Sequence, residues 1–427
     1  MPTRREFLVQ TTMATLSGAA TRHGQAVENK TSKVDESTRS GAGTKDDRAM
    51  RLAIVGTGQI SHRYLKQAAT SKRARFVATC ARSLDSAKGR AVEYGIDRWF
   101  DDYTAMYDAV APDAVVVATP TAVHAAPTIA ALERGIHVLC EKPMAATFED
   151  CRAMVNAAQR GGAVFLSMPY DATAPFMAAL EHLNEATLGV FTGAEAQLLL
   201  PGASRDNWYY DRKIAGGGAG LDTLVYPVSR LISLLGPAQR VTGFVNTLIP
   251  HRILGDGKTI DFVPPPRDST KGKTIESTVD DNTMLLIEWP NGQQAMVRAL
   301  WGTSIVRNDS VLYGRHGTLW FSGNDVIVHS PERAIPNSTP VIWNGYESCY
   351  RLHVPKMENE GLVEHFVDCI KGITKPTCGG QQQLHTHEIL FKGYEAARTK
   401  QTQQLTTTFT TWHQVDPSFY DTRSRFL

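Results

Sequence analysis

The chain has no long apolar segment and no marked excess of charge of either sign. Its apolar runs stay well below the roughly 18 residues that a membrane-spanning helix needs, so we expect no membrane span. The 45 basic and 43 acidic residues leave a net charge of +2. A balance of this kind lacks the basic footprint of a nucleic-acid-binding protein. The sequence therefore predicts neither membrane insertion nor nucleic-acid binding.

Cysteines are few, and none have the Cys-x-x-Cys spacing of a zinc site. The six cysteines stand at positions 80, 140, 151, 349, 369 and 378, which favours neither a metal site nor a dense disulfide framework. His385 and His387 are two residues apart in a segment of helical character, so they point to different sides of the helix. We expect these histidines to be structural or solvent-exposed, and we predict no metal site.

The first 48 residues differ in composition from the rest. Thr3–Leu8, TRREFL, resembles a twin-arginine export signal, and a mildly apolar stretch follows it. We predict a signal peptide over residues 1–26 and, from the polar composition, a disordered linker or arm over 27–48. The expected location is the periplasm, or another compartment reached by the twin-arginine pathway. The alternative is a chance pair of arginines in a disordered tail.

The stretch Arg51–Tyr64, RLAIVGTGQISHRY, predicts a buried strand, a tight turn and a helix. Gly56 permits the turn, and Gly58 has no side chain, so a pyrophosphate can approach the backbone at the positive end of the helix. The third glycine of the usual fingerprint is missing, and Ser61 stands there. A glycine turn between any strand and helix is the alternative. The predicted cofactor contacts of this turn are Gly56, Gly58, Gln59 and Ile60.

An acidic residue is missing after the second predicted strand, Phe76–Cys80. In NAD-binding sheets, Asp or Glu at this point accepts a hydrogen bond from the ribose 2′-hydroxyl, but here Ala81 occupies the position. Arg82 and Ser83 follow, and a guanidinium and a hydroxyl suit a 2′-phosphate. We therefore predict NADP as the cofactor, with NAD as the alternative.

Short apolar strands alternate with helices as far as residue 168. Further strands are predicted at 98–100, 113–118, 137–140 and 164–168. This alternation predicts an α/β domain with a doubly wound parallel sheet, in which ligands lie at the carboxyl ends of the strands. We assign residues 49–170 to this NAD(P)-binding Rossmann domain. The further predicted cofactor contacts are Thr119, Pro120, His124, Glu141 and Lys142, which follow the later strands.

Longer strands with alternating polarity predict an α+β domain over residues 171–427. Its large, mostly antiparallel open sheet is expected to include residues 190–200, 283–288, 294–301, 309–314 and 319–321. Pro290–Gly292 suits a hairpin turn, and a helix is predicted over 176–186. We expect this domain to bind substrate and to form a homo-oligomer, a dimer or a tetramer.

The segment Asn207–Tyr226, NWYYDRKIAGGGAGLDTLVY, carries the candidate chemistry of this half. Its three glycines lead into a predicted helix start. Asp222 and Tyr226 are four residues apart and would share one helix face. The predicted substrate contacts are Tyr170, Trp208 and Arg212. Tyr226 and Asp222 of this segment, with Lys142, are the candidate catalytic residues.

Three motifs together resemble the Gfo/Idh/MocA oxidoreductase family. They are AIVGTGQI at 53–60, VVVATPTAVHAAPTIAALERGIHVLCEKP at 115–143 and GGGAGLD at 216–222. The resemblance implies that Lys142 lies beside the nicotinamide and polarises the substrate oxygen, and that Pro143 shapes the turn that aims it. Tyr226 stands where most of the family has histidine. That substitution resembles the glucose–fructose oxidoreductase and dihydrodiol dehydrogenase branch, which tends to use NADP.

The resemblance implies hydride transfer between the nicotinamide and a hydroxyl or carbonyl carbon of a sugar or polyol. Tyr226 would exchange the hydroxyl proton, and Asp222 would orient the substrate or the lysine. Lys142 would steady the charged oxygen and lower the pKa of the phenol by about 3 pH units. The export signal favours NADP that stays bound and is recycled by a second substrate. The alternatives are a redox-assisted glycoside hydrolase and a non-catalytic nucleotide or sugar sensor of the same fold.

Overall fold

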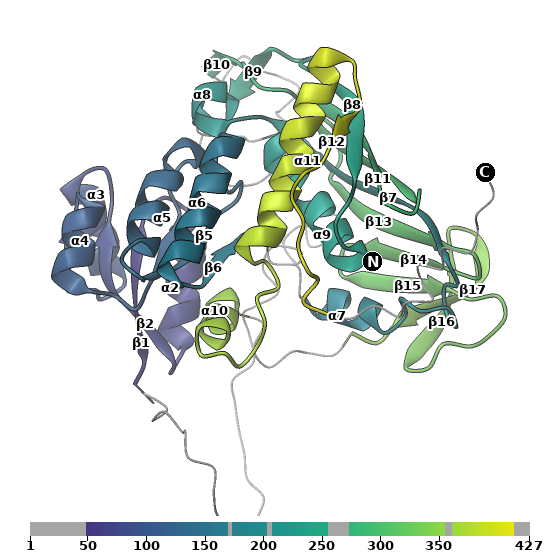
Figure 1. The fold of residues 1–427 in the computed structure, drawn as a ribbon, viewed down its shortest axis with the longest axis horizontal. Coiled ribbons are helices and arrows are strands. Elements are labelled where there is room, and N and C mark those ends of the chain that lie inside the picture. Colours follow the sequence, from purple (N-terminus) through teal and green to yellow (C-terminus); the bar gives the residue numbers. More distant parts are fainter. Residues whose placement is uncertain (1–47, 170–172, 203–206, 255–272, 355–360, 414–427) are drawn as a thin grey trace, which may run out of the picture. The chain divides into compact units, whose positions relative to one another are not determined.

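The computed structural model describes residues 48–169, 173–202, 207–254, 273–354 and 361–413 (Figure 1). The predicted signal peptide, nearly all of the predicted linker and Tyr170 lie outside the described residues. Contacts within the chain separate residues 1–48 from residues 49–427, and the elements below all belong to the second unit. In the ranges just given, no helix combines the length and the apolar character that crossing a membrane requires.

Six parallel strands form the first sheet, in the order β3-β2-β1-β4-β5-β6. β1 and β4 are buried almost throughout, and a strand covered on both faces needs such a continuous apolar run. The strand order reverses between β1 and β4, which is the point where ligands bind in sheets of this kind. The predicted doubly wound sheet is confirmed. The strands are β1 Met50–Val55, β2 Ala74–Cys80, β3 Trp99–Phe100, β4 Ala114–Val117, β5 His137–Cys140 and β6 Phe165–Ser167.

Helices connect the strands of the first sheet, and several begin at a side-chain cap. Asp102 accepts hydrogen bonds from the N–H groups of Thr104 and Ala105, and Thr147 accepts one from Asp150. Such caps satisfy N–H groups that have no partner inside the helix. The elements are α2 Ser61–Thr70, α3 Leu84–Glu93, α4 Tyr103–Val110, the 3-10 turn η1 Thr121–Val123, α5 Ala125–Leu132 and α6 Phe148–Gly161.

Ten strands form the second sheet, in the order β16-β17-β15-β14-β13-β7-β12-β11-β8-β18. β7 and β12 pair in parallel, and the other neighbours pair antiparallel. The predicted mostly antiparallel sheet is therefore confirmed, with β11 and β12 joined through the predicted hairpin turn. The strands are β7 Phe191–Leu200, β8 Arg240–Asn246, β11 Asn282–Glu288, β12 Gln294–Trp301, β13 Arg307–Gly314, β14 Thr318–Ser322, β15 Asp325–His329, β16 Ser338–Trp343, β17 Tyr346–Leu352 and β18 Gln403–Gln404. A separate pair consists of β9 His251–Leu254 and β10 Lys273–Glu276.

Helices α9 and α11 pack on the second sheet, and α11 also packs against α6 of the first (Figure 1). One helix therefore contacts both halves of the fold. Helix α7 is shorter than the predicted 176–186, because Asn184 accepts a hydrogen bond from the N–H of Thr187 in a separate turn. The elements are α7 Ala174–Leu180, the 3-10 turn η2 Asn207–Tyr210, α8 Arg212–Ala215, the π-helical turn η3 Ala219–Thr223, α9 Val225–Leu235, α10 Leu362–Ile370 and α11 Gly380–Thr399.

Candidate active site

The glycine turn lies at the carboxyl end of β1, beside the end of β4. Gly56 has φ +103°, and a Cβ on it would overlap the backbone that follows β4, so only glycine fits there. Gly58 differs, because no protein atom lies within 4 Å of the place its Cβ would take. Gly58, Gln59 and Ile60 are exposed. The open space beside the turn that leads into α2 fits the pyrophosphate of a dinucleotide.

Arg82 and Ser83 are exposed at the carboxyl end of β2. The Ser83 hydroxyl caps α3 by accepting a hydrogen bond of 3.3 Å from the N–H of Ser86. The hydroxyl of Ser86 in turn lies 2.8 Å from that of Thr57 in the glycine turn. A hydroxyl of α3 and a hydroxyl of the glycine turn therefore lie close together near Arg82.

His124 lies behind the ligand-binding edge rather than on it. Its ring is 1% exposed, with Nε2 2.7 Å from the carbonyl oxygen of Thr119 and Nδ1 2.9 Å from that of Pro143. Burial lowers the pKa of His124. The ring thus joins the loops that follow β4 and β5, and its predicted cofactor contact stays a prediction. In front of it Pro120 is exposed, and the buried Thr119 hydroxyl has no partner among the described residues, which suits a polar group of a cofactor.

Glu141 is also buried, and its carboxylate is occupied by the protein. It accepts a hydrogen bond of 2.5 Å from the phenol of Tyr64 and one of 3.0 Å from the N–H of Lys142. These contacts hold Glu141 against the loop that carries Lys142, and its predicted cofactor contact stays a prediction. Tyr64 is not among the predicted site residues. The sequence does contain a signal for Tyr64. It follows Ser61 by three residues in the same helix, so the two side chains share one face, and both are buried.

Lys142 and Asp222 form a largely buried ion pair. The ammonium lies 2.8 Å from Oδ1 of Asp222 and 3.2 Å from its backbone oxygen, and the two side chains are 16% and 13% exposed. Burial lowers the pKa of Lys142, but Asp222 and the neighbouring phenols raise it by more, so the net pKa lies above that of a free lysine. The ammonium is therefore charged at neutral pH.

Two phenols flank this ion pair. The ammonium of Lys142 lies over the ring of Tyr226, 5.1 Å from its centroid. Burial raises the pKa of Tyr226 and outweighs the opposing charge of Lys142. The lysine therefore acts in the predicted direction, but the predicted net fall of this pKa by about 3 pH units is wrong, because burial of the phenol outweighs the charge of the ammonium. Burial and then Asp222 raise the pKa of Tyr209 to about 12. Tyr209 is not among the predicted site residues, although it lies in the segment Asn207–Tyr226.

The regular helix face predicted for Asp222 and Tyr226 does not form. Asp222 belongs to the π-helical turn η3, and Tyr226 lies in the first turn of α9. A π-helical turn has a wider repeat than an α-helix, so a spacing of four does not stack the two side chains. They are brought together instead by Lys142, which contacts both.

The predicted substrate contacts have different surroundings. Trp208 stacks on Tyr209 with the ring centroids 3.8 Å apart, so it lies one ring away from the catalytic group. Arg212 is exposed and holds its guanidinium 5.3 Å from the ring centroid of Tyr394 on α11. Tyr170 lies outside the described residues. Trp208 is therefore linked to the ion pair through Tyr209, whose charge acts on Lys142.

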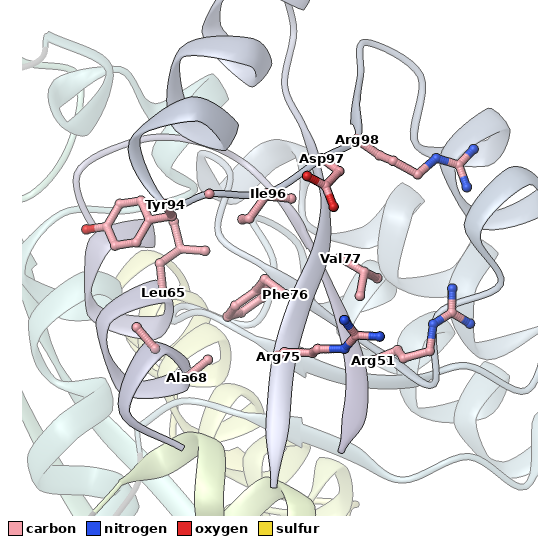
Figure 2. Close-up of a pocket in the computed structure, with 12 residues that line it drawn as sticks. Arg51, Leu65, Ala68, Arg75, Phe76, Val77, Tyr94, Ile96, Asp97 and Arg98 are labelled. Atoms are coloured by element: carbon pink, nitrogen blue, oxygen red, sulfur yellow. The ribbon is translucent and has the colours of Figure 1, made fainter. Parts of the chain in front are cut away.

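A cavity of about 390 Å³ lies on the first sheet, away from this site (Figure 2). Arg51 and Arg98 line it, but both donate hydrogen bonds to carbonyl groups at the end of α4, which stabilises the carboxyl end of that helix. None of the predicted site residues line the cavity. We assign it no part in the chemistry. In the described ranges, no group of His, Cys, Asp and Glu side chains is placed to bind a metal.

Comparison with known proteins agrees with this arrangement. Residues 50–168 match "Oxidoreductase family, NAD-binding Rossmann fold", and residues 176–320 match "GFO/IDH/MocA C-terminal domain". A levoglucosan dehydrogenase of Pseudarthrobacter phenanthrenivorans is 29% identical over 53% of this chain and 59% of its own. The D-glucoside 3-dehydrogenase of Escherichia coli is 32% identical over 44% of this chain and 54% of its own. The matched part of the chain thus spans little more than half the length of these two curated relatives.

Solved structures resemble almost the whole described part of the chain. A levoglucosan dehydrogenase in complex with NADH and L-sorbose has a TM-score of 0.70 at 19% identity, covering 84% of this chain and 99% of its own. The aldose-aldose oxidoreductase from Caulobacter crescentus, complexed with glycerol, has a TM-score of 0.67 at 22% identity. The match covers 84% of this chain and 100% of that oxidoreductase. These likenesses show the fold. The matches to both halves show that the chain belongs to the Gfo/Idh/MocA oxidoreductase family.

Proposed function

We propose that the chain is an NADP-dependent oxidoreductase that moves a hydride between the nicotinamide and a hydroxyl or carbonyl carbon of a sugar or polyol. The observation that carries the proposal is the charged Lys142, paired with Asp222 at the carboxyl edge of the Rossmann sheet. The names of the relatives support the substrate class, since they include dehydrogenases of levoglucosan and of D-glucosides and a reductase of 1,5-anhydro-D-fructose.

NADP, when bound, supplies or accepts the hydride. The ammonium of Lys142 binds the substrate oxygen and stabilises negative charge on it, while Asp222 holds the ammonium in place. Tyr226 keeps its proton because burial raises the pKa of the phenol, so it donates this proton to a carbonyl oxygen during reduction. During oxidation the phenol must first lose its proton. Both acidic groups are protonated at neutral pH, and the site therefore favours reduction of a carbonyl.

The preference for NADP rests on the edge formed by Ala81, Arg82 and Ser83. Solved neighbours contain NADH or NAD, and one relative is named as an NADP(+)-dependent scyllo-inositol 2-dehydrogenase, so the family fold serves both nucleotides. In this chain no acid stands at the end of β2, and the exposed Arg82 and Ser83 offer charge and a hydroxyl. The 2′-phosphate of NADP would bind to the guanidinium and the hydroxyl, whereas the ribose of NAD carries no such charged group at this position.

Product analysis separates this proposal from its rivals. Purified protein is incubated with NADP or NADPH and a panel of sugars, polyols and glycosides. Net oxidation or reduction of one substrate is the expected result. Cleavage of a glycoside without net redox change would indicate the redox-assisted hydrolase, and binding without any turnover would indicate a sensor. The Lys142–Asp222 ion pair favours turnover, because a binding module has no need of a buried cation at this edge.

Export by the twin-arginine pathway and permanent retention of NADP are further parts of the proposal. The support for both is the TRREFL motif at Thr3–Leu8, since this pathway carries folded proteins with their cofactors. Mass spectrometry of nucleotide released from the purified protein tests retention. About one NADP per chain is the expected result, and a nucleotide-free protein that binds NADP weakly would contradict it.

We propose a homo-oligomer, a dimer or a tetramer, formed through the open face of the second sheet. Phe244 on β8 is 75% exposed and Leu286 on β11 is 51% exposed. The register pairs Phe244 with Met284, which lies two residues from Leu286, so these apolar side chains share one face. Light scattering tests the proposal, with Phe244→Asp expected to reduce the mass to that of the monomer.

A further inference from the structure

Asp280, just before β11, is buried and accepts hydrogen bonds from four donors. The N–H groups of Gly218 and Gly220 lie 2.8 and 2.6 Å from its carboxylate oxygens. The Thr283 hydroxyl donates to it at 2.7 Å and the Tyr394 phenol at 2.6 Å. Its side chain is 3% exposed. The carboxylate therefore fixes the backbone that leads directly into Asp222.

The segment 217–220 needs its glycines because its backbone lies so close to Asp280 and Tyr394. A Cβ on Gly218 would overlap the carbonyl oxygen of Asp280, and one on Gly217 would overlap the phenol oxygen of Tyr394. On Gly220 it would lie 2.9 Å from that phenol oxygen. The backbone approaches Asp280 and Tyr394 as closely as glycine permits. The π-helical turn that carries Asp222 begins at this point, and such turns are typical of functional sites.

Helix α11 reaches both sides of the Lys142–Asp222 ion pair. Tyr394 donates a hydrogen bond to Asp280, which in turn holds the glycine segment before Asp222. Two turns earlier, Nε2 of His387 accepts a hydrogen bond of 2.8 Å from the N–H of Met144, in the loop that carries Lys142. Burial lowers the pKa of His387 to about 4, so the ring is a neutral acceptor at neutral pH. One helix thus fixes the two loops that carry the ammonium and its carboxylate.

We propose that Asp280 is a positioning residue, which together with Tyr394 sets the place of the Asp222 carboxylate against the Lys142 ammonium. The inference rests on the proposed function, and it adds a residue that acts through the glycine segment without touching substrate. A carboxylate is needed because its two oxygens accept from all four donors, whereas an amide has a single accepting oxygen. Replacing Asp280 by Asn turns one side of the group into a donor that faces a backbone N–H.

The ionisation of Lys142 tests this inference without any substrate. The protein is labelled with lysine that carries ¹³C at Cε, the signal is assigned with Lys142→Arg, and its shift is followed with pH. The groups that face the ammonium are Asp222, Tyr226 and Tyr209. In the wild type the signal should stay that of the charged form up to the highest pH at which the protein remains folded. In Asp280→Asn we expect the pKa of Lys142 to fall until the signal titrates within this range, because the Asp222 carboxylate is no longer held against it.

Asp281→Asn is the matched control. Asp281 is the next residue, is equally buried, and its carboxylate accepts hydrogen bonds from the N–H groups of Leu248 and Ile249 and from Arg252. It is therefore a multiply bonded buried aspartate that serves a different loop. We expect Asp281→Asn to lower stability and to leave the pKa of Lys142 at its wild-type value. An equal fall of this pKa in both variants would overturn the inference.

Turnover provides the second readout. For Asp280→Asn we expect kcat to fall about tenfold or more, with the KM for NADP changed less than about twofold. Tyr394→Phe, which removes one donor and keeps the ring, should give a smaller fall in both kcat and the pKa of Lys142. If Asp280→Asn does not fold, Tyr394→Phe carries the test, and a wild-type pKa in that variant would overturn the inference. A protein that shows the pKa response but turns over no sugar or polyol would contradict the proposed function alone.

Discussion

The ammonium of Lys142 lies over the ring face of Tyr226, 5.1 Å from its centroid, and donates its hydrogen bonds to Asp222. A cation in this position is held by the negative face of the ring, and its lowering effect on the pKa of the phenol is outweighed by burial. The two residues therefore have separate tasks. Lys142 supplies a fixed charge for the substrate oxygen, and Tyr226 supplies the exchangeable proton.

Replacement of Lys142 should abolish most of the activity and leave cofactor binding intact. We expect Lys142→Ala to lower kcat/KM for the sugar or polyol about 10²- to 10⁴-fold, because a preorganised charge at the developing oxyanion is lost. Lys142→Arg keeps the charge but changes its geometry, so a smaller loss is expected. Steady-state kinetics with NADP fluorescence titration checks both. Unchanged turnover in Lys142→Ala would remove the assignment.

The pH dependence should differ between the two directions of the reaction. Burial raises the pKa of Tyr226, so the phenol is protonated throughout the neutral range. Reduction, which needs the acid form, should be flat through the neutral range and fall only above the ordinary pKa of a phenol, whereas oxidation should rise as the pH increases. Tyr226→Phe keeps the ring under Lys142 and should lower kcat about 100-fold while removing the rise. A rise that persists in this variant would assign the proton to another group.

Arg82 should decide between the two nucleotides. We expect Arg82→Ala to weaken NADP binding about tenfold, close to 1.4 kcal/mol, and to leave NAD binding nearly unchanged. Ala81→Asp should go further, since an acid at this position repels the 2′-phosphate and accepts from a ribose hydroxyl. Titration of both variants with both nucleotides measures the ratio. Equal losses for NADP and NAD in Arg82→Ala would show that the guanidinium does not face the 2′ position.

Acid should destabilise the protein through His387. Burial lowers the pKa of this histidine from 6.5 to about 4, so the unfolded chain binds more protons between these two values. Stability is then fully present above pH 6.5 and falls as the pH decreases towards 4, by about 2 kcal/mol at pH 5 for one such group. Urea unfolding at pH 7 and pH 5 measures this loss. In His387→Gln the loss of unfolding free energy between pH 7 and pH 5 should be smaller by about the contribution of this one histidine. A loss equal to that of the wild type would contradict the assignment of the effect to His387.

Local pattern was sufficient to predict the two sheets and the ligand-binding edge of the first. The continuous apolar runs of β1 and β4 fit strands covered on both faces, and the alternation in β11 and β12 fits a sheet with one open face. Gly56 was identified for the right reason, since its backbone lies at positive φ against the end of β4. These features depend on neighbours along the chain, and spacing alone reveals them.

The support of the catalytic pair was not predictable in this way. Asp280 contacts Gly218 across 62 residues and Tyr394 across 114, and no local pattern connects such positions. The doublet Asp280-Asp281 ahead of an apolar strand was the available signal, because acids at such a place need partners when buried. The polar start of α11 looks solvent-exposed, yet His385 and His387 are fully buried. They accept hydrogen bonds from the N–H groups of Ala238 and Met144, which confirms a structural role.

Transfer of deuterium tests the central claim most directly. The purified protein is freed of bound nucleotide and given NADPH that carries deuterium at both positions of C4 of the nicotinamide, together with a panel of carbonyl sugars, and the products are analysed by mass spectrometry. The account predicts a reduced sugar or polyol with deuterium on the former carbonyl carbon for the wild type, and little or none for Lys142→Ala. Wild-type protein that binds NADPH but yields no deuterated product, or equal transfer by Lys142→Ala, would contradict it.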